Sequence, residues 1–446
     1  MPSPPSPRRP NLIFILADDL GYADLGCCGA RDAASQPVDV SPQLDRLAGA
    51  GIRFTRGYAN SAVCSPTRFA LITGRYQYRL RGAAEEPLAN ARGDKILGLP
   101  PDHPTLPSLL KDAGYATALV GKWHLGYPPH FGPRKSGYGE FWGFHAGGAD
   151  YFAHTDPRGI PDLWDNETPI EQPGYLTDLI SQRAVDFVAR QTQGQPFLLS
   201  LHYSAPHWPW LTRDDVAESE RTRNAGAHLD GGNLATYQRM IHHMDEGIGA
   251  VLAMLEQRGL AENTLVVFTS DNGGERFSNN WPLVGQKMDL LEGGIRVPLL
   301  ARWPAAIRPG TLSHSPNLSM DWSATFLAAA GVSADPDHPL DGVPLQPAFA
   351  DPAWQRPGDL CWRMNHRSQR ALVRGDWKYL RMDGHDYLFN LAQDQRERAN
   401  LALRQPERLA ELRAGWEAWD ASMPAIPPDA RVYKVFSPAQ IPQASF

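Results

Sequence analysis

The sequence predicts an α/β protein in which a sheet flanked by helices is followed by a smaller antiparallel α+β domain. Two continuous apolar segments, Asn11–Ala17 and Thr264–Thr269, have the pattern of strands that are buried on both faces. Such segments alternate with helical patterns along most of the chain, which is typical of α/β proteins. Near the C-terminus the pattern changes, because Ala371–Arg374 and Lys378–Arg381 flank Gly375-Asp376 as the strands of a hairpin flank its turn.

The individual elements follow from apolar periodicity and from capping residues. Ser41 precedes one helical pattern as a candidate N-cap, and Gly114 ends another. Polar residues come directly after several strands, so we expect a site at the carboxyl edge of the sheet. Strands are expected at Asn11–Ala17, Thr117–Val120, Phe197–His202, Thr264–Thr269, Ala371–Arg374, Lys378–Arg381 and Tyr387–Leu391. Helices are expected at Pro42–Ala50, Pro66–Thr73, Thr105–Ala113, Thr177–Arg190, Leu234–Arg258 and Glu407–Trp419.

Length and composition bound the domain organisation and the class of partner. With 446 residues, the chain is long enough for two or three domains. We expect a flexible Pro-rich tail at 1–10, an α/β domain at 11–335 and a C-terminal α+β domain at 336–446. The formal net charge of −6 gives no strong positive field, so neither nucleic acid nor a membrane surface is expected as a partner. An anionic substrate would need a local cationic pocket.

The apolar segments and the cysteines bear on the cellular compartment. The early apolar run Leu12–Ala17 is far shorter than the roughly 20 residues that a bilayer requires, and shorter than a secretory signal. Four cysteines (Cys27, Cys28, Cys64 and Cys361) are too few for a disulfide scaffold, and we expect the adjacent pair to be reduced thiols. The cytoplasm is therefore the expected location, or the periplasm if a signal has been removed.

The most specific segment of the chain runs from Cys64 to Arg75. Its sequence, Cys-Ser-Pro-Thr-Arg-Phe-Ala-Leu-Ile-Thr-Gly-Arg, resembles the C-x-P-x-R … T-G-R signature of type I sulfatases, arylsulfatase-like members of the alkaline phosphatase superfamily. The resemblance implies the fold of that superfamily, a large mixed sheet flanked by helices. The structural alternative is a cysteine at a helix start with proline in the first turn, which is common.

The resemblance also implies how Cys64 would act. A formylglycine-generating enzyme converts the cysteine to formylglycine, whose aldehyde hydrates to a geminal diol. One hydroxyl then attacks sulfur, and the other loses a proton and expels sulfate. An ordinary serine could not release sulfate by that route.

Two oxygen-rich pairs follow predicted strands, namely Asp18-Asp19 and Asp271-Asn272. In neighbouring strands they would bring three carboxylates and an amide oxygen together, a donor set that suits a hard divalent cation. Taken alone, each pair is usually a turn or a cap. Beside the Cys64 motif, the four residues match the calcium ligands of the sulfatase family, so calcium is the cofactor that the resemblance implies.

Basic residues occur in further segments that resemble family motifs. Gly121–Gly126 contains Lys122 and His124, and Ser204–Pro209 presents His207 after a predicted strand. Lys287 lies five residues before the segment Glu-Gly-Gly-Ile-Arg-Val-Pro.

By resemblance, Arg68 and Lys122 steady the charge of the nucleophile and the sulfate, and His124 takes the proton that drives sulfate release. His207 and Lys287 bind sulfate and help to protonate the leaving oxygen. These roles are chemically consistent, because histidine transfers protons near neutral pH and lysine neutralises oxyanions.

Two segments depart from the family pattern and concern the substrate pocket. No serine occurs in Gly143–Tyr151, where many family members carry Ser or His. His145 is therefore a candidate substrate-binding residue, although a structural histidine is an equal alternative. The segment Pro282–Gln286 lacks the basic residue and the second glycine that the family often has. Trp208 and Trp281 are candidates to wall the pocket and stack on a ring, or to lie in the core.

The function that the resemblance implies is hydrolysis of sulfate monoesters, either aryl sulfates or sulfated sugars. Two alternatives stay open. The same site could serve a phosphonate monoester or phosphodiester hydrolase, because sulfate and phosphate esters share a tetrahedral anionic shape. The chain could also be a catalytically silent, metal-stabilised binding protein in which Cys64 remains a thiol.

Overall fold

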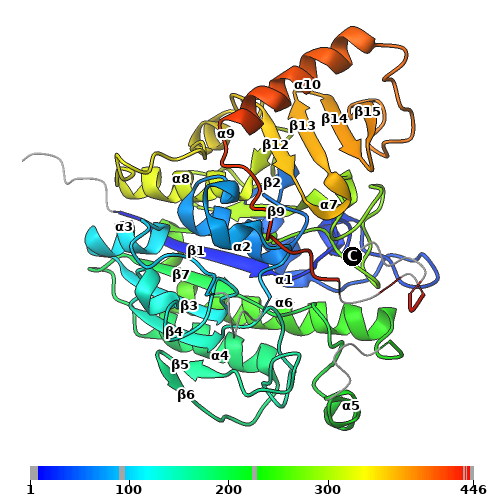
Figure 1. Ribbon diagram of the computed structural model, residues 1–446. Helices are drawn as coiled ribbons and strands as arrows, with labels where there is room; N and C mark the ends of the chain where they lie inside the picture. Colours follow the sequence, from blue (N-terminus) through cyan, green and yellow to red (C-terminus); the bar gives the residue numbers. More distant parts are fainter. Residues whose placement is uncertain (1–8, 90–95, 224–228, 435–436, 438, 442–446) are drawn as a thin grey trace, which may run out of the picture.

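The computed structural model describes residues 9–89, 96–223, 229–434, 437 and 439–441. In this part of the chain, a large sheet with helices on both faces forms the body, and a smaller sheet covered by one helix packs against it (Figure 1). The predicted fold class is therefore confirmed. Of the tail expected at 1–10, only Arg9 and Pro10 lie within the described residues. No described helix is long and apolar enough to span a bilayer, and the expected cellular location stays a prediction.

The large sheet has 11 strands in the order β10-β2-β9-β8-β1-β7-β3-β4-β5-β6, with β11 paired to β2. Its strands are β1 (Asn11–Ala17), β2 (Ile52–Tyr58), β3 (Ala116–Lys122), β4 (Glu140–Phe144), β5 (Trp164–Asp165), β6 (Thr168–Pro169), β7 (Phe197–His202), β8 (Thr264–Ser270), β9 (Arg296–Arg302), β10 (Thr311–Ser313) and β11 (Asn317–Leu318). The five neighbours β8, β1, β7, β3 and β4 run parallel, so their carboxyl ends meet at one edge. All four strands predicted for this domain belong to that parallel group.

Strand β9 was not predicted, and proline explains why. Pro298 lies in the middle of β9 and cannot donate a ladder hydrogen bond, which argues against a central strand when only the sequence is read. The structure accommodates it with a register shift: Phe54 pairs with Leu299 and Gly57 with Val297, so two residues of β2 oppose Pro298. Both β2 and β8 are antiparallel to β9, which makes the sheet mixed.

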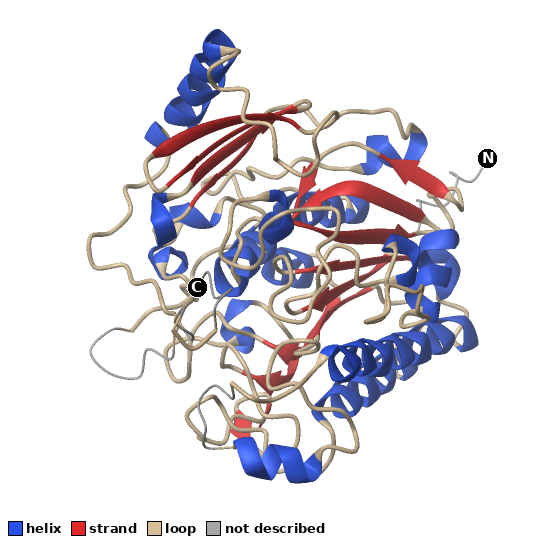
Figure 2. Ribbon diagram, turned by 90° about the vertical axis from the view of Figure 1, so that its right-hand side faces the viewer, coloured by secondary structure: helices blue, strands red, loops and turns tan. Residues whose placement is uncertain are grey.

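Helices cover both faces of the large sheet, as Figure 2 shows. They are α1 (Pro42–Gly49), α2 (Cys64–Thr73), α3 (Leu106–Asp112), α4 (Leu176–Ala189), α5 (Val216–Thr222), α6 (Leu234–Gln257), α7 (Glu292–Ile295), α8 (Ser319–Ala330) and α9 (Gln346–Ala350). Side chains of β1 alternate between the two faces: Ile13 and Ile15 enter the core with α4 and α6, whereas Leu12 and Phe14 enter the core with α2, α3 and α8.

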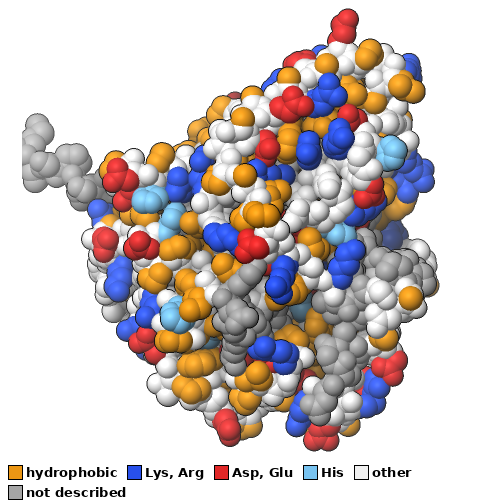
Figure 3. Space-filling model, viewed as in Figure 1, with side chains coloured by type: hydrophobic (Ala, Val, Ile, Leu, Met, Phe, Trp, Pro, Cys, Tyr) orange, Lys and Arg blue, Asp and Glu red, His pale blue; other side chains and the backbone are white. Residues whose placement is uncertain are grey.

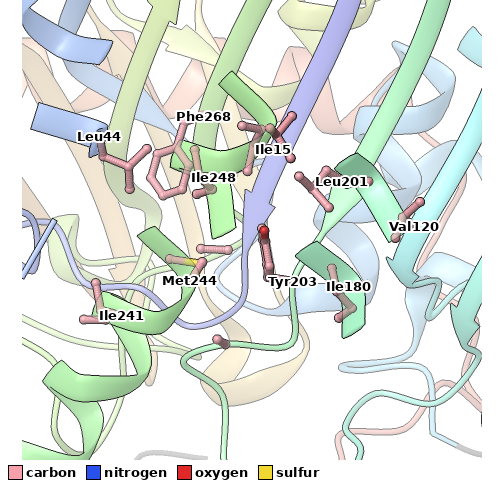
Figure 4. Packing of buried hydrophobic residues seen from close by; sticks show 14 of the residues in the cluster. Ile15, Leu44, Val120, Ile180, Leu201, Tyr203, Ile241, Met244, Ile248 and Phe268 are labelled. Atoms are coloured by element: carbon pink, nitrogen blue, oxygen red, sulfur yellow. The ribbon is translucent and has the colours of Figure 1, made fainter. Parts of the chain in front are cut away.

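Figure 4 shows the first of these cores at close range. Ile15, Leu201 and Phe268, from three adjacent parallel strands, lie near Met244 and Ile248 of α6. These side chains are fully buried. The close packing fixes the strands from which the polar edge residues project.

The smaller sheet is an antiparallel meander of β12 (Leu360–Arg363), β13 (Arg370–Arg374), β14 (Trp377–Met382) and β15 (His385–Asn390), covered by α10 (Pro406–Ala421). The predicted hairpin is confirmed, because Arg374 pairs with Trp377 across Gly375-Asp376. Side chains of this sheet share an apolar core with α2, in which Trp362 and Leu372 accompany Cys64. The C-terminal sheet therefore supports the helix that carries the cysteine motif.

A fully buried ion cluster joins the two sheets. The Lys378 ammonium on β14 lies 3.0 Å from a carboxylate oxygen of Glu292 and 2.8 Å from one of Glu397. Glu292 also accepts a hydrogen bond of 2.9 Å from the Tyr58 hydroxyl, and its backbone N–H donates to Glu397 over 2.6 Å. Arg296 also lies 3.5 Å from Glu292, so removal of the Lys378 ammonium would leave two buried carboxylates with a single neighbouring guanidinium.

We predict that Lys378→Met lowers the free energy of unfolding by about 3–5 kcal/mol, because breaking a buried ion cluster on one side leaves uncompensated charge. Urea denaturation followed by fluorescence measures the change. Lys111→Met, at an exposed position on α3, is the control and should change stability by less than about 0.5 kcal/mol. A Lys378→Met midpoint equal to that of the wild type would contradict a stabilising role for the cluster.

Candidate active site

The predicted site residues meet at the carboxyl edge of the parallel strands. Asp18-Asp19 directly follows β1, and Asp271-Asn272 directly follows β8, with Ala17 and Ser270 paired in register. Lys122 is the last residue of β3. Parallel pairing therefore brings the side chains of Asp19 and Asn272, which are 253 positions apart in the chain, into contact.

The four oxygen-bearing residues lie in mutual contact and are fully buried. The Asn272 side-chain amide donates a hydrogen bond of 2.7 Å to Asp19, and the Asp19 backbone N–H donates one of 3.3 Å to Asp271. Candidate ligand atoms of Asp18, Asp19 and His207 lie within 4.8 Å of one another. The sequence predicted this cluster except for the contribution of His207.

Each carboxylate is matched by a side-chain cation. Lys122 forms an ion pair with Asp18, Lys287 lies 2.7 Å from Asp19, and Arg68 lies 2.9 Å from Asp271.

The two adjacent aspartates have opposite pKa shifts. Burial raises the pKa of Asp19, but the Lys287 ammonium and His207 outweigh it and the pKa falls to about 2. Burial and the neighbouring Asp271 raise the pKa of Asp18 well above its usual value despite Lys122. Of these two aspartates, Asp18 is the one whose charge its surroundings compensate less.

The donor set fits a hard divalent cation. One carboxylate oxygen of Asp18 and the amide oxygen of Asn272 are buried and have no hydrogen-bond partner among the described residues. Buried acceptors are almost always partnered, so these two oxygens indicate a ligand-binding role. With the carboxylates of Asp19 and Asp271, they form an all-oxygen set of the kind that calcium or magnesium prefers.

Cys64 is the first residue of α2, whose predicted start was two residues later. Its side chain is buried, with 2% of the residue exposed. Burial raises the pKa of its thiol to about 11, although Lys122 and Lys287 act to lower it. An unmodified Cys64 is therefore the neutral thiol at pH 7, which is a poor nucleophile.

The residue after Cys64 has a structural role that the motif alone does not reveal. The Ser65 hydroxyl accepts a hydrogen bond of 2.7 Å from the Leu88 backbone N–H, and the Leu88 carbonyl accepts one of 2.8 Å from Nε2 of His124. A carbonyl can only accept, so Nε2 carries the proton. Ser65 therefore helps to orient His124 through Leu88.

His124 and His207 are both held as neutral imidazoles. Burial, followed by Lys122 and Arg68, lowers the pKa of His124 well below its usual value, and its Nδ1 has no partner among the described residues. Nδ1 of His207 donates a hydrogen bond of 2.6 Å to the Trp208 carbonyl, and its Nε2 lies 3.6 Å from Asp19. Burial lowers the pKa of His207 as well.

The segment that lacks the family serine packs two glycines against these histidines. A Cβ at Gly147 would lie 2.7 Å from the His124 ring, and one at Gly148 would lie 3.1 Å from the His207 ring. A larger residue at either position would displace a histidine unless the backbone moved. The two glycines therefore leave room for the histidine rings.

The three candidate substrate residues occupy different environments. His145 is buried between Phe141 and Trp164, and its carbonyl accepts a hydrogen bond from the His124 N–H. Trp208 stacks on His207 at 5.0 Å between ring centroids, inside the site. Trp281 is 58% exposed. Of the three, Trp208 has the position expected for a wall of the pocket, and the substrate roles stay predictions.

Two buried polar residues near the site, His202 and Glu275, were not predicted as site residues. His202, the last residue of β7, places Nδ1 3.3 Å from the Lys122 carbonyl and 3.5 Å from the Arg68 guanidinium. Its place at a strand end was the one signal that could have identified it. Burial raises the pKa of Glu275, three residues after Asn272, to about 7.

The fold and the site define a class of protein, in which an α/β sheet gathers buried oxygen-bearing side chains, a buried cysteine and basic residues at its carboxyl edge. The chain belongs to the sulfatase family, whose model matches residues 10–332. The predicted membership of the type I sulfatases in the alkaline phosphatase superfamily is confirmed.

Individual relatives agree with this assignment. The chain is 34% identical to human N-acetylgalactosamine-6-sulfatase over 370 residues, covering 77% of this chain and 66% of that protein, just under two thirds of its length. It is also 34% identical to human arylsulfatase A, covering 76% of this chain and 68% of that protein. The solved structure of Ps i-CgsB in complex with k-i-k-neocarrahexaose is 32% identical, with a TM-score of 0.81 and coverage of 93% and 94% of the two chains.

We predict that removal of divalent cations with EDTA lowers the melting temperature, and that calcium restores it. A cation that binds only the folded state at 100 times its Kd stabilises by about 2.7 kcal/mol. Asp19→Asn should abolish the response, whereas Asp39→Asn, at an exposed position, should retain it. Differential scanning calorimetry with and without calcium measures this, and an equal response of Asp19→Asn and wild type would contradict the site.

Proposed function

We propose that the protein hydrolyses sulfate monoesters, with formylglycine formed from Cys64 and a calcium ion held by Asp18, Asp19, Asp271 and Asn272. One observation carries the proposal: Cys64 starts a buried helix beside Lys122 and Lys287, whose charges act on it directly. The neutral thiol at this position has little reactivity of its own, which supports a role after conversion. When present, the ion would polarise a sulfate oxygen, and the hydrated formylglycine would supply a hydroxyl nucleophile.

The side chains of this protein have complementary tasks around the ester. Arg68, Lys122 and Lys287 are buried cations, each paired with an aspartate. A bound divalent ion would draw charge from those aspartates and leave the three cations to stabilise an anionic sulfuryl group more strongly than in water. His124 is neutral, and its unpartnered Nδ1 accepts a proton. It is therefore suited to act as the base that drives sulfate release.

His207 is suited to assist the leaving group. Because Nδ1 donates to the Trp208 carbonyl, the neutral ring has Nε2 free of a proton on the side of Asp19. An anionic ester and the Asp19 carboxylate both favour protonation of Nε2. The imidazolium can then donate that proton to the departing oxygen.

The relatives favour a saccharide ester as the substrate class. Human N-acetylgalactosamine-6-sulfatase is named for a sulfated amino sugar, and Ps i-CgsB was solved in complex with a neocarrahexaose. Acidic and basic side chains are interspersed on the face seen in Figure 3, without a broad basic field. Recognition of an anionic saccharide is therefore assigned to the buried pocket.

The proposed function is tested with a panel of esters compared by kcat/KM. N-acetylgalactosamine 6-sulfate, a sulfated neocarrahexaose and 4-nitrophenyl sulfate represent sulfate esters. A phosphate diester and a phosphonate monoester represent the alternative chemistry. Higher kcat/KM for the phosphorus esters would overturn the proposal in favour of that alternative.

We predict that Cys64→Ala lowers kcat by roughly 10⁴-fold or more without changing the melting temperature by more than a few degrees, because the nucleophile is lost but little volume is removed. Cys64→Ser should give at most a single turnover, since a serine sulfate ester cannot eliminate sulfate. Pre-steady-state product release measures both variants. Multiple turnovers by the serine variant near the wild-type rate would contradict the formylglycine mechanism.

The kinetic experiment on the Cys64 variants also needs a measurement of how much Cys64 has been converted to formylglycine in the wild type. Oxidation of Cys64 to formylglycine lowers the mass of its peptide by about 18 Da. Mass spectrometry of active preparations should therefore find the lighter peptide. An active enzyme with only the unmodified thiol would refute the mechanism, and an inactive chain with only the unmodified thiol would favour a silent binding protein.

We predict opposite kinetic signatures for the two histidines. His207→Ala should lower kcat/KM for saccharide sulfates by roughly 10²–10⁴-fold but hardly affect 4-nitrophenyl sulfate, because a nitrophenolate leaves without a proton. His124→Ala should release a burst of the first product and then turn over slowly, since the sulfated intermediate accumulates. Two measurements on each variant test these roles: the dependence of the rate on the pKa of the leaving group, and stopped-flow detection of product release. A reversed pattern would exchange the two roles.

A further inference from the structure

Glu275 differs from the other buried carboxyl groups of the described chain. Both of its carboxylate oxygens are buried and lack a hydrogen-bond partner among the described residues, and 5% of the residue is exposed. Asp24, in contrast, accepts hydrogen bonds from two backbone N–H groups and the Tyr237 hydroxyl. Glu86 likewise accepts two backbone N–H groups. A buried carboxylate without partners is costly, so Glu275 is expected to have one in the functional state.

The loop around Glu275 is held by contacts of the neighbouring residues on both sides. The Asn280 side chain accepts a hydrogen bond from the Gly274 N–H and donates to the Gly274 and Gly285 carbonyls, each at 3.2 Å. On the other side, the Arg276 guanidinium stacks over Trp210 at 4.5 Å. These contacts therefore fix the point on the backbone from which the Glu275 side chain projects.

The loop that carries Glu275 lies beside a proposed leaving-group residue, because the Lys287 backbone N–H donates a hydrogen bond of 3.1 Å to the Gly274 carbonyl. Lys287 and Asp19 are the charged groups that act most strongly on Glu275, and His207 also faces Asp19. Lys287 is already paired with Asp19 at 2.7 Å, and neither forms a hydrogen bond with Glu275. Burial does not exclude substrate contact, because His207 and Lys287 are 5% and 7% exposed.

We propose that Glu275 is a specificity-determining residue, whose two oxygens accept hydrogen bonds from neighbouring hydroxyl or amide N–H groups on the ring that carries the scissile sulfate. This inference rests on the proposed function and narrows its substrate class to saccharide esters. Adjacent donors on a sugar ring match the two oxygens of one carboxylate. An aryl sulfate has no such donors beside its ester and would leave the carboxylate unpartnered.

Glu275→Gln retains the shape of the side chain but replaces one acceptor oxygen with a donor. We expect it to lower kcat/KM about 10- to 100-fold for whichever of N-acetylgalactosamine 6-sulfate and sulfated neocarrahexaose the wild type hydrolyses faster. The value for 4-nitrophenyl sulfate should stay within about threefold of the wild type. Glu262→Gln, the same change at an exposed position, is the control and should change neither value.

Calcium content, Cys64 conversion and melting temperature of each variant complete the experiment. Unchanged values together with selective loss on the saccharide support the inference. Loss of calcium from Glu275→Gln would instead make Glu275 a metal ligand, and equal loss on both esters would make it a general structural residue. Wild-type values on the saccharide would show that it makes no contact. Each of these three outcomes overturns the inference but leaves the proposed function intact.

The proposed function fails in a different way. A fully converted, calcium-bound wild type that hydrolyses none of the sulfate esters would overturn it, and the inference with it. Hydrolysis of 4-nitrophenyl sulfate without either saccharide sulfate would keep the sulfatase activity but overturn both the saccharide class and the inference about Glu275.

Discussion

Three carboxylates and three side-chain cations are buried together at the carboxyl edge of the large sheet, and their mutual neutralisation constrains everything around them. Burial of an uncompensated carboxylate costs several kcal/mol, so each aspartate needs a cation within contact distance. The lysines at 122 and 287 and the arginine at 68 meet that need. A divalent cation and an anionic ester would add charges of opposite sign, so the site can bind both with little net change. Either one alone would disturb the balance.

The architecture makes this concentration of charge possible. Residues that follow β1 and β8 are held by a parallel ladder whose flanking side chains are fully buried, so the loops that carry them begin at fixed points. Asp19 and His124 adopt left-handed backbone conformations, with φ of 65° and 58°. This conformation costs a non-glycine residue conformational free energy, and it persists here because the packed surroundings hold the backbone in place. The C-terminal sheet adds a second support, because it packs behind the helix of Cys64.

The sequence predicted the parts of the structure that depend on local patterns. Asn11–Ala17 and Phe197–His202 are strands with the expected bounds, because their burial on both faces leaves an unbroken apolar run. Arg296–Arg302 escaped prediction because its central proline argues against a strand. Side chains that converge from separate loops were harder still. The link from Ser65 through Leu88 to His124 joins three segments whose proximity no local pattern encodes, and the unpartnered state of Glu275 is visible only in three dimensions.

If Cys64 is oxidised as proposed, its burial imposes an order of events on biosynthesis. The Cys64 thiol is 2% exposed and lies in the core that its own helix shares with the smaller sheet. The active site of another protein therefore has no path to it. An enzyme that oxidises it must therefore reach the chain before these elements close over it. The proportion of competent molecules is then fixed as each chain folds, and no later treatment of the folded protein can raise it. A host that synthesises the chain faster than its oxidising enzyme can act would accumulate well-folded molecules that are permanently inert.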